Sequence, residues 1–193
     1  MHSAFQFNQY LLKRQVFALT GKFRVYDPNG QLALFSQQKM FKLKEDIRVF
    51  SDESMSQELL LIQARQIIDF SAAYDVIDPG YNQKVGVFRR KGFRSIMRDE
   101  WEILDVADQP IGVLHEDNPT RALLRRLLLG TLLPQDYDVL MRGQRVADLR
   151  QNFNLFRYEL NLDFSMDSAN LLDHRLGIAA GILLATIEGK QKS

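Results

Sequence analysis

The clearest candidate for chemistry is a basic stretch in the middle of the chain. Six Lys and Arg occur with no acidic residue between the first and the last, namely Lys84, Arg89, Arg90, Lys91, Arg94 and Arg98. Guanidinium groups match the geometry of phosphate oxygens, and clustered cations raise the local potential even at a net charge of +1. These residues are predicted to bind an anionic lipid headgroup or another phosphorylated ligand. The alternative is a solvated hairpin whose arginines pair with Asp99, Glu100 and Glu102.

A second set of ligating atoms precedes the apolar C-terminal segment. Asp163, Ser165 and Asp167 place side-chain oxygens at alternate positions, which makes them a weak calcium candidate. An EF-hand loop needs Gly at its sixth position and Glu at its twelfth. Counting from Asp163, the chain has Ser168 and His174 there. The default interpretation is therefore that Asp167 or Ser168 caps a helix, and no metal is expected.

Other catalytic constellations are missing from the sequence. His2, His115 and His174 show no metal-binding spacing, and the usual nucleophile, phosphate-loop and dinucleotide motifs do not occur. Cysteine is absent, which excludes disulfides, thiolate nucleophiles and Cys-ligated metal centres. We therefore expect a non-enzymatic protein without a cofactor. An enzyme would need an unrecognised acid–base pair, such as Asp69 with His115.

Composition and charge limit the partners. The 193 residues are 46% hydrophobic and 25% charged, which is average for a globular protein. The net charge of +1 gives no whole-molecule attraction to nucleic acid, so no nucleic-acid partner is expected. The uncharged stretch at 176–187 has 12 residues, whereas a membrane-spanning helix needs about 20. No transmembrane span and no secretory signal are expected, so the expected location is the cytoplasm, including the surface of a membrane.

The elements that position these residues are mainly strands. An Asp-Pro-Asn-Gly turn at 27–30 joins two alternating segments, which predicts a hairpin around 23–25 and 32–34. Further strands are expected at 16–20, 47–50, 74–78, 85–88, 99–104, 137–140, 146–149 and 158–162. Residues 59–70 fit either a helix or two buried strands, and the second half favours strand. Trp101, which alternates with Ile103, is expected in the core.

A first helix is predicted to begin at Asn118. It carries leucines on one face together with Arg121, Arg125 and Arg126. Two roles are open for it. The leucines either plug or cover the sheet, or the helix lies on a membrane surface.

A second helix is predicted at about 168–188. Its core is apolar on all sides, and in a largely β chain the interior of a closed barrel is the place that buries such a helix. Gly177 and Gly181 lie four residues apart on it. In a membrane span this spacing would favour helix dimerisation. Inside a barrel it predicts close approach of the surrounding strands.

Three runs of sequence carry a family resemblance. They are FKLKEDIRVF at 41–50, IIDFSAAYDV at 67–76, and RRKGFRS at 89–95 followed by RDEW at 98–101. With the apolar C-terminal segment they resemble the LURP-one-related family of tubby-C-terminal-like proteins, over about Val16 to Gly189. The resemblance implies a closed antiparallel β-barrel of about 12 strands around a central hydrophobic C-terminal helix. One domain is expected over 1–193, with its core at about 14–189.

The resemblance extends to proteins with known ligands. Tubby domains bind phosphoinositides, and phospholipid scramblases bind calcium and act at membranes, but a shared fold does not carry these activities with it. Two hypotheses follow. The chain binds an anionic, phosphoinositide-like lipid peripherally, or it is a protein-interaction scaffold whose loops contact a protein partner.

Overall fold

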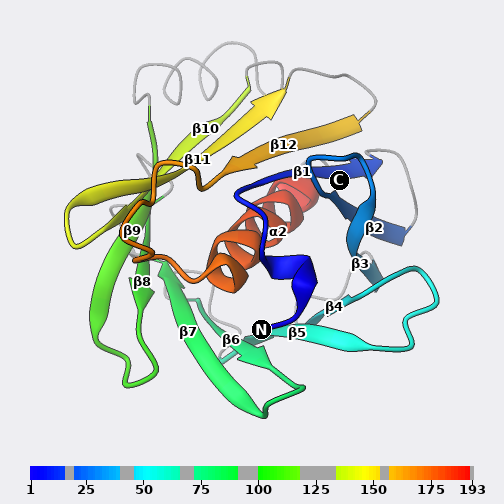
Figure 1. Ribbon diagram of the computed structural model, residues 1–193, viewed down its shortest axis with the longest axis horizontal. Helices are drawn as coiled ribbons and strands as arrows, with labels where there is room; N and C mark the ends of the chain where they lie inside the picture. Colours follow the sequence, from blue (N-terminus) through cyan, green and yellow to red (C-terminus); the bar gives the residue numbers. More distant parts are fainter. Residues whose placement is uncertain are drawn as a thin grey trace.

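Antiparallel strands surround the C-terminal helix of this protein (Figure 1). The computed structural model describes residues 1–15, 20–39, 46–65, 72–90, 100–117, 134–152 and 157–191. Within these ranges the strands are β1 (Gln9–Gln15), β2 (Thr20–Tyr26), β3 (Leu32–Lys39), β4 (Ile47–Phe50), β5 (Glu58–Ala64), β6 (Ala73–Asp78), β7 (Gln83–Arg90), β8 (Glu100–Leu104), β9 (Pro110–Glu116), β10 (Asp136–Met141), β11 (Gln144–Asn152) and β12 (Arg157–Asp163). Each pairs with its sequence neighbours, and β1 pairs with β12, so the twelve strands form a closed barrel.

The strands form because apolar and polar residues alternate along them. On β12, Leu160 and Leu162 are buried in the core while Asn161 between them is exposed. Side chains alternate between the two faces of a strand, so such a pattern places one face in the barrel interior and the other in solvent. Trp101 and Ile103 are both buried, as their alternation on β8 predicts.

The predicted hairpin at 27–30 is confirmed and its turn is held by one side chain. Asp27 Oδ1 accepts hydrogen bonds from the backbone N–H of Asn29 at 2.9 Å and of Gln31 at 2.8 Å. Gly30 has a φ of 76°, a conformation that glycine adopts without strain. The turn chemistry therefore fixes the register between β2 and β3.

The helix α2 (His174–Gln191) fills the barrel interior. Residues 176–185 of the helix have no polar side chain and are buried on all sides. Ile178, Ala179 and Ile182 are among the fully buried residues. A Cβ on Gly177 would lie 2.5 Å from Phe164 Cε1, and one on Gly181 would lie 2.8 Å from Leu162 Cδ2. The two glycines therefore give the clearance that the barrel interpretation predicts.

The helix begins at His174, six residues later than the predicted start at 168. Asp173 caps it, since its Oδ1 accepts from the backbone N–H of Arg175 at 2.9 Å. Asp167 caps an earlier turn instead, accepting from the N–H of Leu171 at 3.0 Å and of Leu172 at 2.8 Å. Two aspartates in one connection thus serve two consecutive turns, and the sequence does not show which one starts the helix.

The two ends of the barrel differ. The turns β2–β3, β4–β5, β6–β7, β8–β9 and β10–β11 and the connection from β12 to α2 lie at one end, which we call the turn end. The short 3-10 helix Ser3–Phe5 precedes β1 at this end. The last residues of β1, β3, β5, β7, β9 and β11 define the opposite end. The strand ends on both sides of the six internal gaps in the described ranges all lie at the opposite end.

Most other strand predictions also hold. Strands occur at the predicted positions 47–50, 74–78, 85–88, 137–140, 146–149 and 158–162. The ambiguous segment at 59–70 is strand as far as Ala64. Strand β1 was not predicted. The rest of the ambiguous segment, residues 16–19 of the predicted strand at 16–20, and the predicted helix from Asn118 lie outside the described residues.

Candidate functional site

Strand β7 carries the described half of the basic stretch. Lys84, Arg89 and Arg90 lie on this strand, and Lys91, Arg94 and Arg98 lie outside the described residues. Side chains alternate along a strand, but a β-bulge between Lys84 and Gly86 shifts this alternation, so Lys84 and Arg89 both face the outer wall.

Lys84 belongs to an ion network on the outer wall. Its Nζ lies 2.6 Å from Asp108 Oδ1 and 3.6 Å from Asp75 Oδ1. Arg65 binds the same two carboxylates, with Nη2 2.6 Å from Asp75 and 2.7 Å from Asp108. The hydrogen bonds from Arg65 and Lys84 hold the pKa of Asp108 well below its usual value. Two cations and two anions thus compensate each other, which leaves little attraction for an external anion.

Arg89 is also paired. Its Nη2 lies 2.6 Å and its Nε 2.9 Å from Glu102 Oε2 on the neighbouring strand β8, where the two residues are directly opposite in register. This is the pairing that the solvated-hairpin interpretation predicts for Arg89. A cross-strand ion pair of this kind stabilises the sheet by a fraction of a kcal/mol up to about 1 kcal/mol.

Arg90 faces the other side of the strand. Its guanidinium lies 5.9 Å from the ring centroid of Trp101, which is 2% exposed and part of the core. Arg14 on β1 is positioned in the same way. Its guanidinium lies 5.6 Å from the ring centroid of Tyr158, and Arg14 is only 3% exposed. Both arginines stack on aromatic rings toward the interior at the opposite end. Sequence reasoning missed Arg14, although its alternation with Tyr10 and Leu12 was the available signal.

Of the three residues of the weak calcium candidate, Asp163 and Asp167 accept hydrogen bonds from backbone N–H groups of nearby turns. Asp163 Oδ1 accepts from the N–H of Ser165 at 2.8 Å and its Oδ2 from Gln9 Nε2 at 3.1 Å. Burial raises the pKa of Asp163, but these hydrogen bonds outweigh it and hold the pKa below its usual value. The Asp167 carboxylate accepts two backbone N–H groups, as described above. In the part of the chain that the structure describes, no three His, Asp or Glu side chains are arranged to hold a metal ion.

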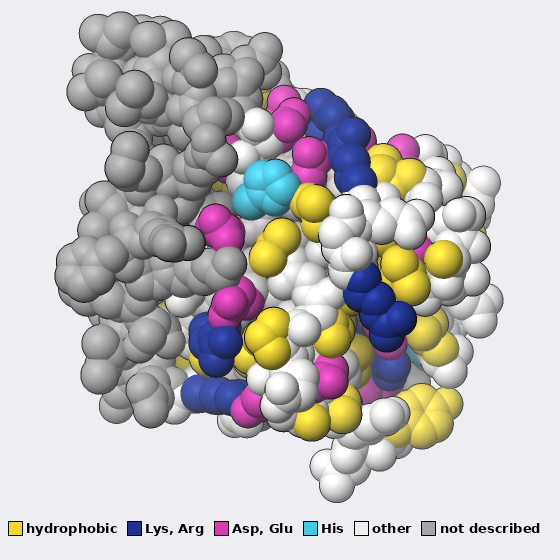
Figure 2. Space-filling model, turned by 90° about the vertical axis from the view of Figure 1, so that its left-hand side faces the viewer, with side chains coloured by type: hydrophobic (Ala, Val, Ile, Leu, Met, Phe, Trp, Pro, Cys, Tyr) yellow, Lys and Arg dark blue, Asp and Glu magenta, His cyan; other side chains and the backbone are white. Residues whose placement is uncertain are grey.

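The outer face of β8 to β12 carries a row of acidic residues around a histidine. His115 is opposite Glu100 on β8 and Asp138 on β10, and Asp138 is in turn opposite Asp148. Burial raises the pKa of Asp138, and Asp117 and Asp148 add to this, while Arg145 opposes it. Figure 2 shows acidic side chains close to a histidine on this face. Asp69, the suggested acid–base partner of His115, lies outside the described residues.

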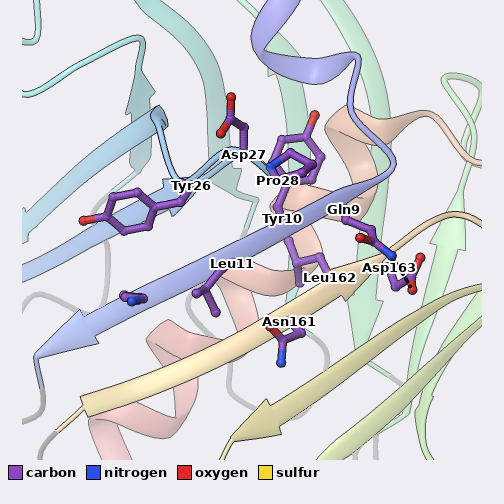
Figure 3. A pocket seen from close by; sticks show the side chains of 11 residues that line it. Gln9, Tyr10, Leu11, Tyr26, Asp27, Pro28, Asn161, Leu162 and Asp163 are labelled. Atoms are coloured by element: carbon purple, nitrogen blue, oxygen red, sulfur yellow. Dashed lines mark hydrogen bonds between the residues drawn. The ribbon is translucent and has the colours of Figure 1, made fainter.

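A pocket of about 650 Å³ lies on the outer wall where β1, β12 and the β2–β3 turn meet (Figure 3). No motif in the sequence pointed to it, because its residues come from both ends of the chain. It is lined by Gln9, Tyr10, Leu11, Lys13, Tyr26, Asp27, Pro28, Gly30, Asn161, Leu162 and Asp163. The side chains include one cation, two carboxylates, two amides and an apolar middle.

A family model described as LURP-one-related matches residues 32–185. This chain belongs to the LURP-one-related family. The family resemblance expected from the sequence is therefore confirmed, together with the closed twelve-stranded barrel that it implied. A comparison with the curated proteins gives no match.

Membership in the LURP-one-related family narrows the class of function. Its members are generally not enzymes. Among the helices that the structure describes in this LURP-one-related barrel, none is both long enough and apolar enough to cross a membrane.

Proposed function

We propose that this LURP-one-related barrel is a non-enzymatic module that binds an anionic, phosphate-bearing ligand of the phosphoinositide type at a membrane surface. The supporting observation is the distribution of charge along the chain. The residues outside the described ranges contain nine of the 25 Lys and Arg but three of the 24 Asp and Glu. The described residues therefore carry an excess of acidic groups, and in the remaining segments the sequence has three times as many cations as carboxylates.

The proposal assigns the ligand to Lys91, Arg94 and Arg98 in preference to Lys84 and Arg89. The first three follow β7 in the sequence, beyond its last residue at the opposite end of the barrel. Lys84 and Arg89 are held by carboxylates at 2.6 Å and would have to give up these partners to bind an anion. Each Lys or Arg near an acidic membrane surface contributes about 1 kcal/mol.

The test is co-sedimentation with vesicles of phosphatidylcholine alone, with phosphatidylserine, and with a phosphoinositide, each at low and at physiological salt. A triple variant, Lys91→Ala, Arg94→Ala and Arg98→Ala, is compared with a matched control, Lys84→Ala and Arg89→Ala. The wild type is expected to bind the acidic vesicles and to lose binding as salt rises. The triple variant should bind on the order of 100-fold more weakly, and the control should bind as the wild type does.

Competition by a soluble inositol phosphate distinguishes recognition of the phosphorylated headgroup from attraction to the charged bilayer surface. If the inositol phosphate competes with the vesicles, the phosphorylated headgroup is recognised, and if it does not, the charged surface of the bilayer is required. Absence of binding to every acidic vesicle at low salt would overturn the proposal. The favoured function would then be a protein-interaction scaffold. Its direct evidence would be capture of a protein partner in a complex that survives high salt.

A further inference from the structure

The outer-wall pocket lies on strands other than the one that carries the basic stretch, and it has its own chemistry (Figure 3). Because side chains alternate along β1, Gln9, Leu11 and Lys13 line the pocket from one face of the strand while Tyr10 and Leu12 are buried in the core. Its volume of about 650 Å³ lies within the usual range for small-ligand sites. A cation, Lys13, and a carboxylate, Asp163, lie toward its two ends.

One end of the pocket is positive. Lys13 Nζ lies 3.8 Å from Glu159 Oε1, which is beyond hydrogen-bond distance, and 5.5 Å from the ring centroid of Tyr26. Within the described residues the Lys13 ammonium has no hydrogen-bond acceptor. Its three N–H donors are therefore open to an oxygen of a ligand.

The other end is negative and rigid. Asp163 is held by Gln9 and by the N–H of Ser165, and its lowered pKa keeps it ionised at neutral pH. Asp27 lies across β1 from Asp163, on the β2–β3 turn. Its Oδ1 accepts two backbone N–H groups of that turn, whereas its Oδ2 accepts none in the described part of the chain. A carboxylate accepts up to about four hydrogen bonds, so both residues can still receive a donor from a ligand.

The two ends are separated by an apolar middle and by a defined length. Leu11 lies between Gln9 and Lys13 on β1. Tyr26, beside Lys13, and Pro28, in the turn, add apolar surface to the lining. Gln9 is directly opposite Asp163, and Lys13 comes four residues later on the same strand, which corresponds to about 14 Å of extended chain. An extended peptide covers about 3.3–3.6 Å per residue. Three or four residues of peptide would therefore span the pocket.

We propose that this pocket binds a short peptide, of three or four residues with apolar side chains, by its two charged ends. The amino terminus lies at Asp163, and the terminal carboxylate lies at Lys13. A simple anion is disfavoured by the two carboxylates and a simple cation by Lys13, whereas a zwitterion of this length satisfies both ends. This site is independent of the basic stretch and of its proposed lipid ligand.

The test is a titration of the ¹⁵N-labelled full chain with the tetrapeptide Ala-Leu-Ala-Leu, followed by NMR. Three forms are compared: free at both ends, acetylated at the amino terminus, and amidated at the carboxyl terminus. The free form should give saturable shifts confined to residues of β1, β12 and the β2–β3 turn. Each blocked form should bind at least about tenfold more weakly, because one charge-assisted hydrogen bond is lost.

Two variants at the positive end give opposite expectations. Lys13→Gln should weaken binding of the free peptide at least about tenfold and leave the amidated form unaffected. Glu159→Gln should strengthen binding, because it removes the carboxylate that competes for Lys13.

At the negative end, Asp163→Asn should weaken binding of the free and amidated peptides and leave binding of the acetylated peptide unchanged. Lys84→Gln on β7 is the matched control and should bind as the wild type does.

Two results would overturn the proposal. One is the absence of saturable shifts up to about 10 mM free peptide, a concentration well above that needed for a specific small-ligand site. The other is equal binding of the free and blocked forms, which would show that the ends are not recognised. Spectra of each variant that retain the dispersion of the wild type establish that the barrel is folded when binding is measured.

Discussion

Arg175, in the first turn of helix α2, donates from Nη1 to Asp78 Oδ2 at the end of strand β6, at 2.7 Å. The same guanidinium lies 2.6 Å from Asp173, the residue that caps the helix. The side chains of Arg175 and Asp78 are 12% and 7% exposed. Asp78 Oδ1 also accepts from the N–H of Tyr81 in the next turn, at 3.3 Å. One buried ion pair therefore joins the start of the central helix to the barrel wall.

Replacing Asp78 by Ala is expected to lower the free energy of unfolding by about 3 kcal/mol, because it leaves a buried guanidinium with half of its partners. Urea denaturation measures the loss. The matched control is Arg48→Ala, which breaks the pair with Glu58 at a side chain that is 54% exposed and should cost less than about 1 kcal/mol. Equal, small losses in the two variants would show that the buried pair does not anchor the helix.

Gly177→Ala is expected to destabilise the barrel by about 1–3 kcal/mol although Ala favours helix more than Gly does. The new Cβ would lie 2.5 Å from the ring of Phe164, which stacks on His174 with centroids 4.8 Å apart. Gly80→Ala is the control, since its Cβ would meet Asp78 Oδ1 at an ordinary 3.4 Å. Thermal unfolding compares the two. A melting temperature of Gly177→Ala at or above that of the wild type would contradict the close approach.

Stability should fall in the alkaline range because of Tyr10. Burial raises the pKa of its phenol from 10.0 to about 12, opposed by the hydrogen bond to Phe7. Since the folded-state pKa is raised, the unfolded chain ionises first. The contribution is therefore complete below pH 10 and is lost as the pH rises toward 12, by on the order of 2 kcal/mol. Ultraviolet titration should show that Tyr10→Phe lacks a phenol that ionises late in the wild type. A wild type in which every phenol ionises near pH 10 would contradict this.

Removal of residues 171–193 is expected to prevent folding. The deletion takes away Ile178, Ile182 and the other buried residues of α2, and the inner faces of the strands would surround an empty space. Near-ultraviolet circular dichroism and thermal unfolding of the truncated chain give the readout. A cooperative unfolding transition of the truncated chain would show that the barrel does not depend on the helix.

Much of the fold follows from local patterns in the sequence. The hairpin at 27–30 and the strands that alternate cleanly were predicted because period two and turn chemistry act within a few residues. Strand β1 was missed because Leu11 is apolar yet faces outward, where it lines the pocket. The burial of the helix could be predicted because it lacks a polar face. The residue at which it begins could not be predicted, because Asp167 and Asp173 both cap turns.

The candidate sites depended on relationships that a sequence does not display. Arg89 and Arg90 are adjacent, yet one pairs with Glu102 and the other stacks on Trp101, so the run of cations does not form one surface. Alternation alone separates these two, but the partners depend on register between strands. The pocket joins Gln9 to Asp163, which are 154 positions apart. No local pattern connects them.

The closure of the barrel between its first and last strands has a consequence for biosynthesis. Each strand from β1 to β11 meets its next neighbour soon after it leaves the ribosome, but β1 has no partner until β12 is made, and the interior stays unfilled until α2 is made. Synthesis of such a chain takes about 10–40 s. Throughout this time the growing sheet has two unpaired edges and a bare apolar face. We therefore expect the nascent chain to depend on chaperones until β12 and α2 have been made and the helix enters.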